Sequence, residues 1–367
     1  MKVQYLVNIP SPYRVDFFSE LSKYVELTVI YERRSASDRD ERWIGEKKSS
    51  YKEIYLDAQP IGTDNSISLK VIKVLDLQAD VIVIGMYSTL TSMIAQSYLR
   101  ARKKPYVINS DGGFVGRESS IKKYIKTKLI SGAEWWLSTG KKTSQYLEYY
   151  GAQKEHIYTY PFSSIHEKDV VYRTDEEKKE MKKNLGFNNE TVVLSVGQFI
   201  PRKGYDILLN AATQLSQTIK WVIVGGKPTN EYLELVRKYQ LKNVIFIDFL
   251  KPNELYKYFI AADLFVLPTR EDIWGLVINE AAAFGLPIVT TDRCIAGSEI
   301  IQNGTNGIVV KANSIEDLKT GINCILSTKF QSEFDRKKAV DIALNYTIEN
   351  MAKIHAEIFS EIKGKKK

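Results

Sequence analysis

The feature that most constrains the fold of this chain is a regular alternation of short apolar runs with stretches of helical periodicity. Strands that alternate with helices along a chain usually form parallel sheets with right-handed crossovers. In the first half, the pattern predicts strands at 3–9, 26–31, 52–57, 80–85, 105–110 and 134–139, and helices at about 13–24, 66–77, 89–101, 118–131 and 140–150.

The second half of the chain repeats this alternation, with strands predicted at 191–196, 220–224, 243–249, 264–268 and 287–291 and helices near 204–216, 230–240, 252–262, 275–284, 314–327 and 347–362. The polar stretch 163–189 has no strand pattern and contains the domain boundary. We therefore predict an α/β fold of two Rossmann-like domains, 1–168 and 169–346, with a C-terminal helix at about 347–367 as a candidate to pack back on the first. Ligands of such sheets bind beyond the carboxyl ends of the strands.

The composition fits two globular domains: 367 residues, 44% hydrophobic and 26% charged. Cys294 and Cys324 suit neither a disulfide framework nor a metal-binding spacing, so the expected compartment is a reducing cytoplasm. The first apolar run, 3–9, is strand-like and lacks the long apolar core of a secretion signal. No stretch reaches the roughly 20 apolar residues of a membrane span.

The net charge of +8 is unevenly distributed, since residues 1–168 carry 25 Lys and Arg against 19 Asp and Glu. Such an excess suits an anionic partner, which can be a membrane surface, a phosphorylated substrate or a nucleic acid. No helix-turn-helix, zinc spacing or aromatic RNA-binding signature is found, so nucleic acid is not an expected partner.

The first chemical motif runs from Val196 to Gly204, between a predicted strand and a predicted helix. Gly197 permits a tight turn, and Arg202 and Lys203 lie near a helix start, where the helix dipole favours anions. Together they suit a diphosphate, with Lys as a point charge and Arg as a fork. The alternative is a solvated Arg-Lys pair in a turn.

The second motif runs from Pro268 to Glu280 and again joins a strand to a helix. Backbone N–H groups around Trp274, Gly275 and Leu276 are suited to phosphate or sugar oxygens. Asp272 and Glu280, with seven residues between them, supply carboxylate acceptors for sugar and ribose hydroxyls. The alternative is a helix cap at Asp272 and a surface acid at Glu280.

Taken together, these segments resemble family 4 of the glycosyltransferases, which have the GT-B fold of two Rossmann-like domains facing a central cleft. The resemblance covers residues 191–310 most closely. It rests on the Gly197-Gln198…Lys203-Gly204 loop, on the acids that frame a Gly-Phe-Gly-like turn, and on the segments Leu286–Thr291 and Glu299–Gly307. The Pro-rich turn at 10–14 is similar to the corresponding turn in one branch of this family, whose members make bacterial capsular and other surface polysaccharides.

The resemblance implies roles for individual residues. Arg202 and Lys203 hold the diphosphate, and Glu280 binds the ribose hydroxyls. Asp272 and the amides of Ile273, Trp274, Gly275 and Leu276 hold the transferred sugar. The family's usual Arg in the first motif is here Gln198, so Arg202 is a candidate to replace its charge. The working acid is either Asp272 or its neighbour Glu271.

The N-terminal half supplies the expected acceptor side. Pro12, Tyr13 and Arg14 follow the first strand, where the family has an acceptor loop. Asp111 comes directly after the fifth predicted strand and is followed by Gly112 and Gly113, which permit close approach of a ligand. Asp111 is a candidate to orient a nucleophilic hydroxyl, and the alternative is a cap of the next helix.

The segment 121–130 combines helically spaced apolar residues with Lys122, Lys123, Lys126 and Lys128. One interpretation is a helix on an anionic membrane surface, which suggests peripheral attachment at the inner face of the plasma membrane. The other is an ordinary surface helix whose apolar stripe lies in the core.

The expected function is that of a retaining glycosyltransferase, which moves a sugar from a nucleotide-sugar donor, expected to be a UDP-sugar, to a glycan or lipid-linked acceptor. No cofactor or metal is expected, because cationic side chains and helix-start amides stabilise the leaving diphosphate. The tripeptide Asp38-Arg39-Asp40 lies in a polar loop and is not an expected metal site. The alternative is a sugar-nucleotide epimerase or hydrolase of the same fold. A dehydrogenase is rejected, because no Gly-x-Gly-x-x-Gly follows the first strand.

Overall fold

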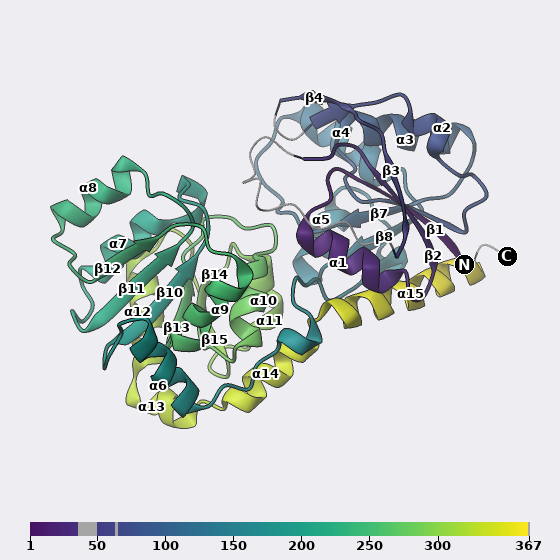
Figure 1. The fold of residues 1–367 in the computed structure, drawn as a ribbon. Coiled ribbons are helices and arrows are strands. Elements are labelled where there is room, and N and C mark those ends of the chain that lie inside the picture. The colour runs from purple at the N-terminus through teal and green to yellow at the C-terminus, as the bar shows by residue number, and fades with distance from the viewer. Residues whose placement is uncertain (36–49, 63–64, 366–367) are drawn as a thin grey trace. The chain divides into compact units, whose positions relative to one another are not determined.

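The computed structural model describes residues 1–35, 50–62 and 65–365. The Asp38–Asp40 tripeptide therefore lies outside the described residues. The chain divides into two compact units (Figure 1): the first is Met1–Ser164 with Thr347–Lys367, and the second is Ile165–Tyr346. This division falls four residues before the boundary expected at 168/169, inside the same polar stretch.

The first unit is built on a seven-stranded parallel sheet with the order β3-β2-β1-β6-β7-β8-β9. Its inner strands are almost completely buried runs of Val, Ile and other apolar residues, as expected for a parallel sheet covered on both faces. The strands are β1 (Lys2–Val7), β2 (Glu26–Tyr31), β3 (Lys52–Tyr55), β6 (Val81–Ile84), β7 (Val107–Ser110), β8 (Trp135–Ser138) and β9 (Ile157–Thr159). The main helices are α1 (Pro12–Leu21), α3 (Leu90–Ala101), α4 (Ser120–Ile130) and α5 (Lys141–Tyr149).

The C-terminal helix α15 (Ile348–Lys365) belongs to the first unit, although it follows the whole second unit in the sequence. Figure 1 shows it in yellow beside the purple α1, and these two helices pack against each other. Its buried face repeats every three or four residues, which is the period of an amphipathic helix. The buried positions are Ile348, Met351, Ala352, His355, Ile358, Phe359 and Ile362.

The second unit is built on a six-stranded parallel sheet with the order β12-β11-β10-β13-β14-β15. Its strands are β10 (Thr191–Val196), β11 (Ile219–Val224), β12 (Val244–Ile247), β13 (Leu264–Leu267), β14 (Ile288–Thr291) and β15 (Gly307–Val310). Its helices are α6 (Asp175–Asn184), α7 (Tyr205–Ala212), α8 (Asn230–Lys238), α9 (Pro252–Ala261), α10 (Leu276–Ala283), α11 (Ile295–Ile300), α12 (Ile315–Leu326), α13 (Thr328–Glu333) and α14 (Arg336–Leu344).

Both sheets reverse their winding direction at one point, between β1 and β6 in the first unit and between β10 and β13 in the second. In doubly wound sheets, ligands bind at this switch point, beyond the carboxyl ends of the two strands. In the second unit, the loops at this point are the two motifs singled out in the sequence. The predicted α/β class with two Rossmann-like sheets is confirmed.

The helix predicted at 66–77 is wrong. The chain there forms an antiparallel hairpin of β4 (Gln59–Ile61) and β5 (Asn65–Ile67), and only the short α2 (Val71–Val74) is helical. Ser66 pairs with Pro60 across the hairpin, and its carbonyl accepts from the Thr91 hydroxyl at 3.0 Å. The Ser66 amide also donates to Asn65 Oδ1 at 2.9 Å, so both backbone groups of Ser66 are bonded in the extended conformation of β5.

The polar stretch at the domain boundary also contains a helix, α6, that the sequence pattern does not predict. Thr174 caps it by accepting from the Glu177 amide, and the Glu177 carboxylate accepts from the Thr174 amide. This reciprocal capping box stabilises a helix that has no buried residue. Throughout the described ranges, no helix is both long and apolar enough to cross a membrane.

Candidate functional site

The two motifs of the second unit meet at its switch point. The first leaves β10 through Gly197 and the exposed Gln198 and forms a short 3-10 turn, Pro201–Lys203. Gly204 ends this turn with a φ of +71°, and a Cβ on it would lie 2.2 Å from the Pro268 carbonyl oxygen. Only glycine permits this backbone conformation and this close approach together. The first motif is thereby held against the start of the second.

Hydrogen bonds join the two loops further. The carbonyl of Arg202 accepts from the Arg270 amide at 2.8 Å and from the Thr269 hydroxyl at 3.0 Å. In return, the Arg202 guanidinium donates to the Glu271 carbonyl at 2.7 Å. Residues about 70 positions apart in the sequence thus form one surface at the ends of β10 and β13.

The charged centre of this surface is the pair Lys203 and Asp272. Lys203 Nζ donates to Asp272 Oδ2 at 2.5 Å, and the side chains are only 12% and 13% exposed. Arg202 Nη1 lies 3.6 Å from Asp272 Oδ1 with a side chain that is 44% exposed. The Lys203 side chain is therefore mostly buried while that of Arg202 faces solvent, and both cations lie beside one carboxylate.

The neighbouring acid, Glu271, has a different partner. Its carboxylate accepts from Arg293 Nη2 at 2.5 Å. Arg293 lies two residues after the end of β14 and was not singled out in the sequence, although a cation close to the carboxyl end of a parallel strand is a usable signal. Arg270 is held by Asp206 through two hydrogen bonds of 2.8 and 2.5 Å. The two candidate acids thus bind different cations: Asp272 lies beside Lys203 and Arg202, and Glu271 binds Arg293.

The second motif continues into α10. Ile273 is exposed, whereas the Trp274 ring is buried and its indole N–H donates to Asn279 Oδ1 at 2.8 Å. Gly275 caps α10 with a φ of +99°. A Cβ there would lie 2.6 Å from Cys294 Sγ.

Leu276 begins α10, and Glu280 is half-buried near its middle. Cys294 bonds the Trp274 carbonyl at 3.1 Å. Burial raises the pKa of its thiol to about 12, and the Asp272 carboxylate adds to this effect. Cys294 is therefore a packed thiol rather than a nucleophile at neutral pH.

In the first unit, the residues predicted for the acceptor side lie at the carboxyl ends of β1 and β7. Pro12 and Tyr13 open α1, and the Tyr13 ring packs edge-on against Phe162 at 5.6 Å between centroids. The next residue, Arg14, is buried and donates through Nη2 to both carboxylate oxygens of Asp111, each at 2.5 Å. The structure thus joins two of the predicted residues that lie 97 positions apart.

Gly112 and Gly113 follow Asp111 but differ in surroundings. Gly112 has a φ of +151°. A Cβ on Gly113 would lie 2.8 Å from the Tyr146 ring, so this glycine permits close packing of a tyrosine. Tyr146 in turn bonds Tyr87 through their hydroxyls at 2.6 Å.

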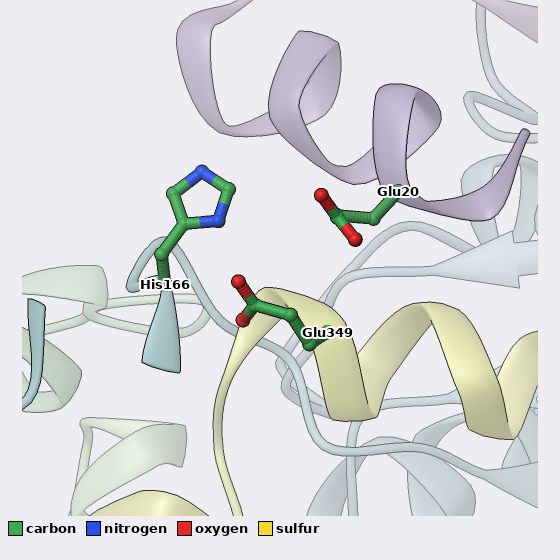
Figure 2. A group of neighbouring side chains, drawn as sticks. All are labelled: Glu20, His166 and Glu349. Atoms are coloured by element: carbon green, nitrogen blue, oxygen red, sulfur yellow. The ribbon is translucent and has the colours of Figure 1, made fainter. Parts of the chain in front are cut away.

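Three groups that can offer metal ligands are drawn in Figure 2. Glu20 on α1 and Glu349 on α15 belong to the first unit, whereas His166 belongs to the second. The Glu20 carboxylate already accepts from Lys23 Nζ at 2.7 and 2.6 Å. We therefore assign no ion to these side chains, and metal independence stays a prediction.

Known families and structures show similarity to the region that contains this site. Residues 176–342 match the family model described as "Glycosyl transferases group 1". This region includes both motifs and every predicted donor-side residue. The structure of Anabaena Alr3699/HepE in complex with UDP covers 98% of this chain and all of that chain, with a TM-score of 0.79 and 17% identity.

Two curated relatives match this chain, and in both cases the match covers about half of this chain and about half of the relative. One is an uncharacterized glycosyltransferase of Methanocaldococcus jannaschii, 29% identical over 50% of this chain and 48% of its own. The other is the N,N'-diacetylbacillosaminyl-diphospho-undecaprenol alpha-1,3-N-acetylgalactosaminyltransferase of Campylobacter jejuni, 24% identical over 52% of this chain and 50% of its own. Residues 176–342 therefore match the glycosyltransferase group 1 family, and the chain has the GT-B fold of solved glycosyltransferases.

Proposed function

We propose that the chain is a retaining glycosyltransferase that moves a sugar from a UDP-sugar to a glycan or lipid-linked acceptor in surface-polysaccharide synthesis. The observation that carries the proposal is the cluster of Lys203, Arg202 and Asp272 at the switch point of the second sheet. Two cations beside one carboxylate suit a ligand that joins a diphosphate to a hydroxyl-rich sugar.

The chemistry follows from the donor. The bond from the sugar to the diphosphate breaks, and negative charge grows on the departing phosphate. Lys203, Arg202 and the start of α10 stabilise that charge, since fixed cations and helix-start amides need no reorganisation as the bond breaks. Asp272 accepts from sugar hydroxyls, and Glu280 from the ribose. The acceptor hydroxyl attacks from the face that the phosphate leaves, and the phosphate takes its proton.

On the acceptor side, Asp111 orients the attacking hydroxyl. It lies at the carboxyl end of β7, and its side chain is 25% exposed. A carboxylate there accepts a hydrogen bond from the hydroxyl and fixes its direction, which lowers the entropic part of the barrier.

The donor and acceptor classes are supported by the similar proteins. Alr3699/HepE was solved with UDP, and the Campylobacter relative is named for a lipid-linked diphospho-undecaprenol substrate. The alternative of an epimerase or hydrolase is not favoured, because the curated relatives are named as transferases.

The test begins with thermal stabilisation of the purified protein by UDP-, GDP- and dTDP-sugars, because a ligand that binds only the folded state raises its melting temperature. We expect the UDP-sugars to stabilise most. Transfer is then measured with membrane lipid extracts, and the anomeric configuration of the product is read by NMR. Release of UDP at the same rate with and without acceptor would favour a hydrolase, and an inverted product would exclude retention.

We also propose that the acceptor side lies on an anionic membrane surface through α4. The predicted alternative, an apolar stripe in the core, fails for the first two turns of this helix: Ile121 is 74% exposed, Tyr124 63% and Ile125 44%, and only Leu129 and Ile130 are buried. Exposed apolar side chains beside lysines suit the boundary between headgroups and acyl chains.

The lysines of α4 are not equivalent. Lys126 pairs with Glu118 at 2.9 Å, and Lys123 donates to the Tyr149 hydroxyl at 2.8 Å. Lys122 and Lys128 are exposed. Each lysine near an anionic leaflet contributes about 1 kcal/mol, and the attraction weakens with salt. We expect the paired Lys126 to contribute least.

Vesicle sedimentation tests this surface. We expect binding to anionic vesicles that weakens at high salt, when Lys122, Lys123, Lys126 and Lys128 become Gln, and when Ile121 and Ile125 become Ser. The matched control changes four other exposed lysines of the first unit to Gln: Lys52, Lys70, Lys73 and Lys154. Equal sedimentation with neutral and anionic vesicles, or equal losses in the control, would return α4 to an ordinary surface helix.

A further inference from the structure

The strongest unexplained feature of the first unit is the environment of Asp111. Three donors converge on Oδ1: Arg14 Nη2 at 2.5 Å, Asn109 Nδ2 at 3.1 Å and the Tyr160 hydroxyl at 3.3 Å. Within residues 1–35, 50–62 and 65–365, Oδ2 accepts from Arg14 alone, at 2.5 Å. A carboxylate oxygen has about two acceptor sites, so Oδ2 keeps room for a further donor.

The groups that donate to Asp111 are themselves fixed by further hydrogen bonds and by ring packing. Asn109 Oδ1 accepts from the Tyr5 hydroxyl at 3.1 Å, and Asn109 Nδ2 also reaches the Tyr160 oxygen at 2.9 Å. The Tyr160 ring packs against His355 of α15 at 4.3 Å between centroids. Asn109, Tyr5 and Tyr160 are all buried. The carboxylate is therefore fixed by a rigid set of side chains from β1, β7, α1 and the segment after β9.

Arg14 is the cation among these donors, and its side chain is more deeply buried than that of Asp111. The Arg14 side chain is 5% exposed and Asp111 is 25% exposed. The guanidinium also lies over the rings of Tyr13 and Phe162, at 5.7 and 5.8 Å from their centroids. Burial lowers the pKa of Arg14, but the Asp111 carboxylate and nearby tyrosines outweigh it and raise the pKa overall. The cation thus stays charged behind a carboxylate that reaches solvent.

Arg14 also carries a cost that stability alone does not explain. Its Nη1 is buried and has no hydrogen-bond partner among the described residues. An unsatisfied buried donor costs about 1–3 kcal/mol, and more when it is charged. An apolar side chain would fill this space without an unsatisfied donor. The arginine is explained if its function is to place Nη2 against both oxygens of Asp111.

We propose that Arg14 is a positioning residue: it does not touch the acceptor, but fixes the Asp111 carboxylate so that Oδ2 accepts from the attacking hydroxyl. The inference rests on the proposed transferase activity, and it changes the role expected for Arg14 from acceptor contact to support of Asp111. Misplacement of a reacting group by about 1 Å can cost about 100-fold in rate.

The test compares Arg14→Lys, Asp111→Asn and the double variant in the transfer assay. Lysine keeps the charge, but its shorter side chain has no planar guanidinium and cannot hold a donor where Nη2 of Arg14 lies against both oxygens of Asp111. We expect Arg14→Lys to lower kcat about 10- to 100-fold, with KM for the UDP-sugar within about twofold of wild type. We expect the double variant to be no slower than Asp111→Asn alone, because Arg14 acts only through Asp111.

The matched control is Arg173→Lys. Arg173 is equally buried, but its Nη1 donates to the carbonyls of Phe259 and Ala262 at 3.0 and 2.8 Å, so its loss should lower the melting temperature and leave kcat unchanged. If Arg14→Lys does not fold, Tyr160→Phe carries the test, because it removes one donor to Asp111 and keeps the ring. A several-fold loss of kcat in that variant supports the proposal.

Two results would overturn the inference: kcat unchanged in folded Arg14→Lys or Tyr160→Phe, or losses that multiply in the double variant. Absence of transfer by the wild-type protein with every donor would instead overturn the proposed function, and the positioning role with it.

Discussion

Lys203 Nζ and Asp272 Oδ2 lie 2.5 Å apart, and this contact joins the two loops that leave β10 and β13. Both side chains are mostly sheltered from water. A partly desolvated pair is strong while intact and costly to break, because the remaining charge loses its partner. A donor diphosphate would offer Lys203 a second anion, and a sugar hydroxyl would offer Asp272 a second donor.

Removing the cations of the first motif should slow transfer. We expect Lys203→Ala and Arg202→Ala each to lower turnover about 10²- to 10³-fold, since each removes one contact to the developing charge. The measurement is kcat with a UDP-sugar, and circular dichroism checks the fold. The control is Lys238→Ala, an exposed lysine in the last turn of α8 in the same unit. Turnover within about twofold of wild type in both site variants would remove the diphosphate assignment.

A chelator should leave the reaction unchanged. Lys203, Arg202 and Arg293 gather positive charge at the switch point, where a divalent ion would otherwise be needed to stabilise a leaving diphosphate. We expect full activity in excess EDTA, with the same rate after magnesium or manganese is added. Activity that is lost in EDTA and restored by either ion would contradict this mechanism.

The sequence predicted the inner strands of both sheets, because buried parallel strands are apolar throughout and their signal is local. It missed the edge strands β9 and β15, which are short and only partly buried. It also indicated the two motifs of the second unit, since each directly follows such a strand. It missed Arg293 and the partnership of Arg14 with Asp111, because those contacts depend on which strands are neighbours. The helix expected at 66–77 is not formed, because β5 pairs with β4 and the Ser66 carbonyl accepts from the Thr91 hydroxyl. Hydrophobic periodicity contains no information about such contacts.

Gly204 should be required for the contact between the two loops. Its φ of +71° strains any other residue, and a Cβ would lie 2.2 Å from the Pro268 carbonyl oxygen. The control is Gly186→Ala, which has a similar φ of +77° and nothing within 4 Å of the added Cβ. We expect Gly186→Ala to cost about 1–2 kcal/mol of unfolding free energy and Gly204→Ala clearly more. Equal costs, measured by denaturant unfolding, would mean that the approach to Pro268 is not limiting.

The buried His355 should make the first unit sensitive to acid. This ring is fully buried on α15 between Phe17, Tyr160 and Phe359, and its Nδ1 is 2.7 Å from the Met351 carbonyl. Burial lowers its pKa from 6.5 to about 3, the Met351 carbonyl opposes this, and the Arg14 cation adds to the lowering. The folded state therefore binds fewer protons than the unfolded chain between these values. Stability is fully present above about pH 6.5 and is lost as the pH falls towards 3.

His355→Phe keeps an aromatic ring in the same packing and removes the titration. At pH 4.5, two pKa units into the window, the wild-type protein should have lost about 2–3 kcal/mol through this group. Burial raises the pKa of Glu32, whose contribution runs in the opposite direction, so the comparison is made between the variant and wild type at each pH. We expect the variant to be less stable at pH 7, where it loses the bond to Met351, and to lose less stability than wild type on acidification. The readout is hydrogen exchange of the α1 and α15 amides together with denaturant unfolding. Parallel pH profiles of the two proteins would show that His355 does not control the acid sensitivity of this unit.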